Sequence, residues 1–537
     1  MSVKSFEAEQ QAQQKRLAAE NLLGFMVGEF ADKLRSIGRM DLLDGISNKA
    51  LEYFSDFSSA NDHLTAEARF KHGQTLEAMG EVAYSRGKID EAVAALQAAV
   101  EQNLRGPVQF GAQPVNTFGV NERLAYHKVP GISFALIHNG ALSWAQGYGT
   151  VAAASDQAVT VNTVFQAASI AKPVTAFAVM RMQQQGLLDI NASIATYLTS
   201  MTLAKGKQTP EAQVSFKNLL DHSSGLTGGG YMGYEKGAAI PSDLQTFNGE
   251  APANTKAASV ETRPGSQVSY SGAGYTLAEI ALIDTFKQPF EQLMASWLLS
   301  PLGMKNSALA LDYPQQQGVE VALGHDRAGK IISGGWRRHP EQAAAGLWST
   351  ASDLARFAIE TTKAYQGNST LLSQAAAREM LAPVMPEQDL SEEFGGQPAM
   401  TFIVAGAGKQ FLFKHGGGTL GYRCFMLMYP ETGDGAVFMT NSDAGYSIGF
   451  EMLRAASFVY NWPDFKGKSY TKRKVNLEEQ AVFIGEYPFD AGWQVEIISV
   501  AEADGIAVKF PNGDLYPLTA VQGDNTDLNQ HSYVHED

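Results

Sequence analysis

Residues 165–177 read FQAASIAKPVTAF and mark the beginning of an apolar run. The apolar spacing over 169–186 predicts an amphipathic helix. Pro173 has no backbone N–H and is tolerated only in a first helical turn, which places Ser169 at the helix start. Ser169 and Lys172 then share one face, because three residues make slightly less than one turn. A serine hydroxyl beside an amine that takes its proton is an activated nucleophile.

The Ser-x-x-Lys spacing does not identify a site by itself. It occurs twice more in the chain, at Ser85/Lys88 in a turn between two predicted helices and at Ser469/Lys472 in a charged segment. A solvated serine and a surface lysine explain such matches. The case for Ser169 therefore depends on the residues that accompany it.

Composition narrows the class of protein. The chain has 537 residues, 45% of them hydrophobic, and a formal net charge of −15. The length predicts roughly three folded units, and the acidic balance argues against nucleic acid and anionic membranes as partners. A single cysteine, Cys424, excludes an internal disulfide framework. Without an apolar leader or a membrane-spanning stretch, we expect a cytoplasmic protein as written, or a periplasmic one if the chain is a processed form.

Three domains are expected, over residues 1–105, 106–465 and 466–537. The first is predicted to be all helical, and part of it has the spacing of one tetratricopeptide repeat: Leu76, Met79, Gly80, Ala83, Ala92, Leu96 and Ala99. This segment is either a module that binds a protein partner or an ordinary helical hairpin. The last domain begins with a basic linker over 466–474 and then becomes all β.

The central domain is predicted to be α+β. Asn139-Gly140 between two apolar segments indicates a β-hairpin. Further helices are expected over 351–364 and 446–459, and further strands over 402–405, 410–414, 422–429 and 435–440. A chain that opens with a hairpin, continues with helices and returns to hairpins suggests a mainly antiparallel sheet flanked by helices.

Several segments, in their order along the chain, resemble the serine β-lactamase and penicillin-binding-protein superfamily, above all class C β-lactamases and β-lactamase-like esterases. The resemblance covers residues 116–460 and includes FQAASIAKPVTAF, LLDHSSGL (219–226), VSYSGAGYTLAE (268–279), SPLGMKNS (300–307), AAAGLWSTASDLARF (343–357) and FKHGGGTLGYR (413–423). It implies an antiparallel sheet flanked by helices together with an all-helical subdomain.

The resemblance also implies roles for individual residues. Ser169 would attack a carbonyl to form an acyl-enzyme, with Lys172 and Tyr270 sharing the work of the general base. A tyrosine takes that proton only if nearby cations lower its pKa. The oxyanion would lie between the N–H groups of Ser169 and Gly418, on a strand edge that includes Gly416 and Gly417. No metal or cofactor is implied.

Two positions depart from the superfamily pattern. Gly272 stands where Tyr-x-Asn has its asparagine, and His415-Gly416-Gly417 replaces Lys-Thr-Gly. The second change exchanges a permanent cation for a group expected to titrate near neutrality. The resemblance implies that the first change removes an amide that contacts the acyl side of the substrate. It also implies that loss of the lysine and of the threonine hydroxyl beside it weakens activity on β-lactams and D-Ala-D-Ala peptides, so we expect a carboxylesterase acting on a small-molecule ester. A D-amino-acid peptidase, a DD-carboxypeptidase or a weak β-lactamase on the same site is the alternative.

The remaining candidate groups have simpler interpretations. A catalytic part for His415 is left open, because this histidine could equally cap a strand. His222 is interpreted as structural, and Cys424 as a small buried residue.

Two other motifs compete with Ser169. Residues 416–421 match G-x-G-x-x-G, but the aromatic segment that follows predicts a strand, which excludes a dinucleotide site. Residues 445–449 match the nucleophile elbow G-x-S-x-G around Ser447, although only about ninety residues remain for the acid and the histidine. A third possibility is a catalytically idle scaffold whose helical domain binds a partner.

Overall fold

The structure is a computed structural model, and it describes Lys33 and residues 66–110, 116–314, 318–391, 395–473, 477–490, 493–500, 505–511, 513, 515–521 and 532–534. The chain divides into two compact units. One contains residues 121–449, and the other combines residues up to 120 with those from 450 onward. No helix in the described ranges has the length and apolarity needed to cross a bilayer.

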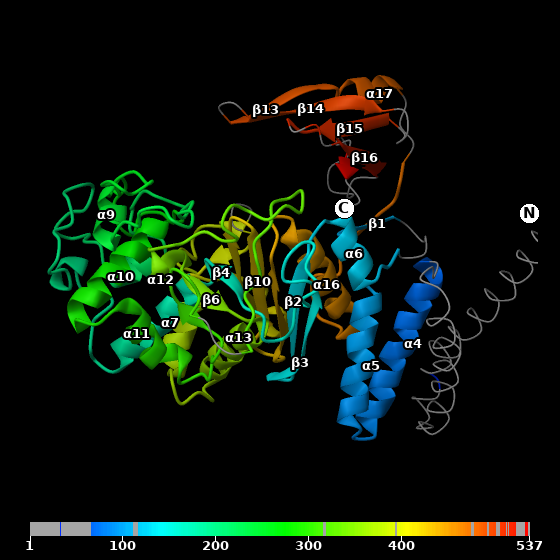
Figure 1. The fold of residues 1–537 in the computed structure, drawn as a ribbon, viewed down its shortest axis with the longest axis horizontal. Helices are drawn as coiled ribbons and strands as arrows, with labels where there is room; N and C mark the ends of the chain where they lie inside the picture. Colours follow the sequence, from blue (N-terminus) through cyan, green and yellow to red (C-terminus); the bar gives the residue numbers. More distant parts are fainter. Residues whose placement is uncertain are drawn as a thin grey trace, which may run out of the picture. The chain divides into compact units, whose positions relative to one another are not determined.

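A seven-stranded antiparallel sheet with the order β3-β2-β11-β10-β9-β8-β7 forms the centre of the larger unit (Figure 1). Its strands are β2 (Gly131–His138), β3 (Ala141–Gly149), β7 (Gln397–Pro398), β8 (Ile403–Ala405), β9 (Leu412–Thr419), β10 (Tyr422–Tyr429) and β11 (Asp434–Thr440). The predicted antiparallel sheet is confirmed. The strand expected over 410–414 is longer than predicted, so the glycines that follow His415 belong to β9.

The opening hairpin forms as predicted. Asn139 and Gly140 have φ values of +52° and +73°, which suit the two-residue turn between β2 and β3. β2 also pairs with β11, so the first strand of the sheet lies beside a strand about three hundred residues later in the chain. The central strands are apolar and buried, which explains why this pairing is stable.

Helices cover the sheet and form a separate helical region (Figure 1). α13 (Ala351–Gln366) packs against β2, β3, β10 and β11. Among the described residues, the other α-helices that begin in this unit are α7 (Ala171–Gln184), α8 (Phe216–Leu220), α9 (Asp243–Asn248), α10 (Gly272–Phe286), α11 (Phe290–Met294), α12 (Gln342–Ala345), α14 (Gln374–Met380) and α16 (Gly445–Val459). The short helix α6 (Val120–Tyr126) begins at the boundary between the two units. α9 to α12 gather beside the sheet as the expected helical subdomain.

α7 differs from its prediction in two ways. It begins at Ala171, so Ser169 precedes the first helical residue, and Pro173 lies in the first turn as expected. The predicted amphipathic pattern is wrong, because side chains all round the helix are buried, including the amine-bearing Lys172. α7 therefore runs through the core, where Phe177 packs edge-on against Phe357.

A small sheet positions the start of α7. β4 (Phe165–Ala168) pairs with β6 (Leu347–Ser349), which also pairs with β5 (Ala308–Leu309). β4 also contacts the large sheet. The hydroxyl of Thr419 donates to Gln166 Oε1 at 2.9 Å, and Cys424 Sγ donates to the Ala167 carbonyl at 3.0 Å. The residue that follows β4 is thereby held close to β9.

In the smaller unit, α4 (Ala66–Ser85) and α5 (Ile89–Gln102) form a helical hairpin around the predicted turn at Gly87. A Cβ on Gly80 would lie 2.5 Å from Leu96 Cγ, so the small residue permits the close approach of the two helices. Apart from Lys33, the part of the helical prediction over 1–65 lies outside the described residues. The tetratricopeptide identity and a partner for this segment stay predictions.

The C-terminal β module is a five-stranded antiparallel sheet, β13-β14-β15-β16-β17, preceded by the short helix α17 (Leu477–Ala481). Its strands are β13 (Gly485–Asp490), β14 (Trp493–Val500), β15 (Gly505–Lys509), β16 (Leu515–Val521) and β17 (Ser532–Val534). The segments that flank the central domain also contain strands, because β1 (Val108–Phe110) pairs in parallel with β12 (Lys468–Tyr470). The division into three domains stays a prediction.

The contact between β4 and β9 predicts the effect of one substitution. A Cβ on Gly417 would lie 2.3 Å from the Ala167 carbonyl and 2.5 Å from Cys424 Sγ. Gly417→Ala should therefore lower the free energy of unfolding by about 1–3 kcal/mol, as overpacking does. Gly418→Ala is the matched control, because its Cβ meets nothing closer than 3.5 Å. Equal stability of the two variants in chemical denaturation would contradict this packing.

Candidate active site

Ser169 lies on a tight turn between a strand and a helix. Ala168, the last residue of β4, has a φ of +50°, which is uncommon for a residue with a side chain. The Ser169 carbonyl accepts the N–H of Lys172 at 3.0 Å, and the Ile170 N–H donates to the Ala167 carbonyl. The turn thus places the Ser169 side chain, which is half-buried, ahead of the first turn of α7.

The Lys172 amine makes two hydrogen bonds inside the protein. Nζ is 3.2 Å from Ser169 Oγ and 2.8 Å from the carbonyl oxygen of Ala344 in α12. The residue is 2% exposed, and within the described part of the chain it joins no ion pair. A buried amine with two fixed oxygen partners has little freedom, so its distance to the Ser169 hydroxyl is set by the fold.

Tyr270 lies beside the Lys172 amine but presents its ring to it. Nζ is 4.9 Å from the centroid of the Tyr270 ring and 5.7 Å from that of Tyr275. In the described residues no hydrogen bond joins Tyr270 Oη to Ser169 or Lys172, and the side chain is 40% exposed. Substrate-free sites often have long catalytic contacts, so the shared role of Tyr270 as general base stays a prediction.

His222, interpreted from the sequence as structural, packs against Tyr270. The two ring centroids are 4.4 Å apart. The Ser271 N–H donates to His222 Nδ1 at 3.2 Å, and the Ser269 N–H donates to the His222 carbonyl at 2.8 Å. Burial and the nearby charge of Lys172 hold the pKa of His222 well below its usual range. The imidazole is therefore neutral and braces both the ring and the backbone around Tyr270.

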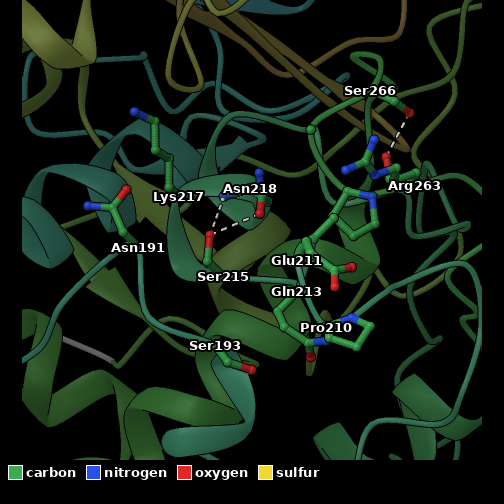
Figure 2. Close-up of a pocket in the computed structure, with 13 residues that line it drawn as sticks. Asn191, Ser193, Pro210, Glu211, Gln213, Ser215, Lys217, Asn218, Arg263 and Ser266 are labelled. Carbon is green, nitrogen blue, oxygen red and sulfur yellow. Dashed lines mark hydrogen bonds between the residues drawn. The ribbon is translucent and has the colours of Figure 1, made fainter.

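The turn that carries His222 is fixed by polar contacts. Asp221 accepts the N–H and hydroxyl of Ser223, and its burial raises the pKa of its carboxyl to about 6. Asn218 Nδ2 in turn donates to Ser223 Oγ at 2.9 Å. Asn218 also lines a polar pocket of about 570 Å³ (Figure 2), in which it contacts Ser215. None of the predicted catalytic side chains lines this pocket.

His415 lies near Lys172 and cannot supply the positive charge that a lysine would carry at its position. The residue is 6% exposed, and burial together with the charge of Lys172 lowers the pKa of its imidazole to about 3. The expectation that His415 titrates near neutrality is therefore wrong, since desolvation disfavours the charged ring. At neutral pH this position supplies a polar, uncharged group. Whether His415 acts in catalysis stays a prediction.

The three glycines after His415 lie in β9 and have different surroundings. Gly417 is buried against β4, whereas Gly418 is exposed and pairs with Arg423 of β10. The hydroxyl of Tyr446 donates to the Gly417 carbonyl at 3.1 Å. Contacts with β4 and with Tyr446 thus fix β9 at Gly417, next to Gly418. That the N–H groups of Ser169 and Gly418 bind the oxyanion stays a prediction.

The competing motifs around Ser85 and Ser447 are not assembled into sites. Ser85 Oγ donates to the Val82 carbonyl while Lys88 pairs with Glu91. Ser447 is exposed on α16, and within the described ranges no hydrogen bond joins it to a histidine. The glycines of the dinucleotide-like motif lie in β9 and the turn to β10, with no helix after them.

Comparison with known proteins agrees with this architecture. Residues 119–459, more than half of the chain, match the family described as Beta-lactamase. The chain belongs to the beta-lactamase family. A beta-lactamase from Providencia stuartii is 28% identical over 233 residues, which are 43% of this chain and 55% of that protein. The chain spans between 55% and 61% of the length of the first curated relatives that it matches.

Solved structures share the family fold. The octameric penicillin-binding protein homologue from Pyrococcus abyssi superposes with a TM-score of 0.56 at 19% identity, covering 77% of this chain and 93% of that one. EstCE1, described as a hydrolase with promiscuous acyltransferase activity, gives a TM-score of 0.50 at 17% identity and covers 64% of this chain and 96% of its own. The antiparallel sheet of this beta-lactamase family differs from the doubly wound sheet that a nucleophile elbow at Ser447 requires.

The buried His415 of this beta-lactamase-family chain predicts a specific dependence of stability on pH. Its folded pKa of about 3 lies below the unfolded value of 6.5. The unfolded chain therefore binds this proton between those values, and stability is lost as pH falls from 6.5 toward 3. Replacing His415 with Gln should reduce the slope of the unfolding free energy by up to about 1.4 kcal/mol per pH unit between pH 6 and 4. An unfolding free energy that changes with pH at the same rate in the wild type and in His415→Gln would contradict the low pKa of His415.

Proposed function

We propose that this chain is a serine hydrolase that forms an acyl-enzyme on Ser169, and that simple carboxylic esters are its preferred substrates. The observation that carries the proposal is the 3.2 Å contact of Lys172 Nζ with Ser169 Oγ, made by an amine that the Ala344 carbonyl holds in place. Nucleophile and base in direct contact, with the base oriented by a third group, form the arrangement that covalent catalysis needs.

The reaction is a two-step acyl transfer. The neutral form of the Lys172 amine accepts the Ser169 proton as Oγ bonds to the ester carbonyl carbon. The ester C–O bond then breaks, and the Lys172 ammonium returns that proton to the departing alkoxide, which leaves as the alcohol. Water then attacks the acyl-enzyme and releases the carboxylic acid, restoring the Ser169 hydroxyl. Backbone N–H groups of Ser169 and Gly418 are the proposed oxyanion donors, and Tyr270 is the proposed partner of Lys172 in moving the proton.

Charge around the site supports esters over substrates that carry a carboxylate. His415 is neutral at physiological pH, so the position offers no cation to bind a carboxylate. Arg423, beside the exposed Gly418, is already committed to Asp443 at 2.9 Å and to two backbone carbonyls. β-Lactams and peptides ending in D-alanine carry that carboxylate, whereas a simple ester does not need a cationic partner.

Labelling with a fluorophosphonate probe, followed by peptide mapping, tests the nucleophile. We expect label on Ser169, loss of label in Ser169→Ala, and full labelling of Ser447→Ala. The serine is activated only where a base contacts it, and among the residues that the structure describes no base is hydrogen-bonded to Ser447. Label that persists in Ser169→Ala and disappears in Ser447→Ala would support an elbow nucleophile instead, and a wild-type chain without label would support the scaffold alternative.

Substrate preference is tested with two chromogenic compounds. We expect a higher kcat/KM for p-nitrophenyl butyrate than for a chromogenic cephalosporin, because neither the neutral His415 nor Arg423, which is paired with Asp443, is available to bind the cephalosporin carboxylate. Ser169→Ala should abolish both activities and serves as the control for background hydrolysis. Faster turnover of the cephalosporin would favour a β-lactamase or peptidase function.

A further inference from the structure

α12 is too short to be stable by itself. A helix of four residues cannot form the run of internal hydrogen bonds that stabilises a longer helix. Nearly all of its backbone groups are end groups, with N–H groups at the start and carbonyls at the end that need partners from outside the helix. α12 packs against α7 and α10 (Figure 1), and these two helices supply such partners.

The residue that precedes α12 does not cap it. Glu341 is the N-cap, and its side chain makes no hydrogen bond to the helix. Glu341 Oε1 instead lies 2.8 Å from Nδ1 of His339, and both residues are buried. A helix usually takes a side-chain oxygen from its own N-cap. The first turn of α12 therefore needs an acceptor from another segment.

Glu279 of α10 supplies this acceptor. Its Oε2 accepts the N–H of Ala343, the second helical residue of α12, at 2.8 Å. Glu279 is 1% exposed, so the contact is made inside the core. The cap of α12 thus comes from a helix that lies 64 residues earlier in the chain.

The same turn of α12 holds the proposed base. Ala344 directly follows Ala343, and its carbonyl oxygen accepts Lys172 Nζ at 2.8 Å, while that nitrogen lies 3.2 Å from Ser169 Oγ. Because the two alanines are neighbours in one helical turn, a shift of the Ala343 N–H also shifts the Ala344 carbonyl. The contact with Glu279 is therefore transmitted to the amine through a single residue step.

Other acids surround the Glu279 carboxyl. Burial holds its pKa well above the usual range, and Asp243 of α9, Glu341 before α12 and Glu291 of α11 act in the same direction. The uncharged acid is therefore the favoured form. It offers an oxygen to the N–H of Ala343 without a negative charge, which would favour the ammonium form of Lys172 over the amine that accepts a proton.

We propose that Glu279 is a positioning residue for the reaction at Ser169. Its carboxyl caps α12 in place of the N-cap residue and so fixes the Ala344 carbonyl, which holds the Lys172 amine against the serine hydroxyl. This inference rests on the proposed hydrolase function. It adds a residue that is separate from the nucleophile, the base and the oxyanion strand and that acts through the backbone of α12.

Hydrogen exchange tests the cap without an enzyme assay. Glu279→Met keeps an unbranched side chain of similar length but offers only a weak acceptor. Amide exchange in the peptide that contains Ala343 should become roughly tenfold faster in this variant, because one hydrogen bond is lost. Glu279→Gln keeps an oxygen for the N–H and should retain the protection. Equal protection in the wild type and in Glu279→Met would overturn the cap.

Release of p-nitrophenol from p-nitrophenyl butyrate in a single turnover tests the consequence for Lys172. Glu279→Met should slow acylation by roughly tenfold to a hundredfold, because small displacements of a reacting group cost that much rate. Glu279→Gln should restore the rate to within about twofold of the wild type, because it restores the acceptor.

Asp284→Leu is the matched control for a general loss of stability. Asp284 lies on the same helix, and its Oδ2 accepts the N–H groups of Thr199 and Ser200 at 2.7 and 2.8 Å. Those two residues belong to a segment that carries no part of the proposed site. Asp284→Leu should therefore lower the free energy of unfolding and leave the acylation rate of the folded protein unchanged.

The outcomes separate this inference from the proposed function. A folded Glu279→Met variant that loses protection at Ala343 but acylates at the wild-type rate overturns the positioning role. Acylation slowed equally in Glu279→Gln, or equally in Asp284→Leu, overturns it as well. A wild-type chain that releases no p-nitrophenol and takes no fluorophosphonate label on Ser169 overturns the proposed function and with it the part of Glu279 in acylation, while hydrogen exchange still decides whether Glu279 caps α12.

Discussion

The hydrogen bond from Lys172 Nζ to the Ala344 carbonyl, 2.8 Å long, is the contact on which the site depends. A buried amine must find fixed partners, and this one joins α7 and the adjoining turn that presents Ser169 to the carbonyl of Ala344 in α12, which lies 172 residues after the lysine. α10 belongs to the same assembly, because Glu279 accepts the N–H of Ala343 just before that carbonyl. Helices that look independent in sequence are thus positioned around one amine.

Neutral groups surround this amine. His222 and His415 are both buried, and the desolvation that lowers their pKa values is reinforced by the Lys172 charge. Both imidazoles therefore remain uncharged near the nucleophile at neutral pH. Ser169 and the Lys172 amine are in contact, while His415 is neutral and Arg423 is already paired with Asp443, and this combination is what favours an ester in our proposal.

Pattern in the sequence predicted what depends on local geometry. The order of hairpins and helices along the chain predicted the sheet, and the Asn139-Gly140 turn predicted its opening hairpin. The spacing of Ser169, Lys172 and Pro173 predicted their arrangement at the start of a helix. Properties that depend on three-dimensional surroundings were missed. Burial all round α7, the low pKa of His415 and the packing of His222 on Tyr270 arise from segments far apart in the chain, which no local spacing reveals.

The central claim is that Lys172 activates Ser169, and the acylation rate measured in a single turnover tests it most directly. p-Nitrophenyl butyrate mixed with excess protein reports formation of the acyl-enzyme through release of p-nitrophenol. Lys172→Met replaces the lysine with an unbranched side chain of similar length that has no amine. The unfolding curve of the variant verifies that it is folded. Loss of the base should slow acylation by roughly a hundredfold to ten-thousandfold. A folded Lys172→Met variant that acylates at the wild-type rate would contradict the account.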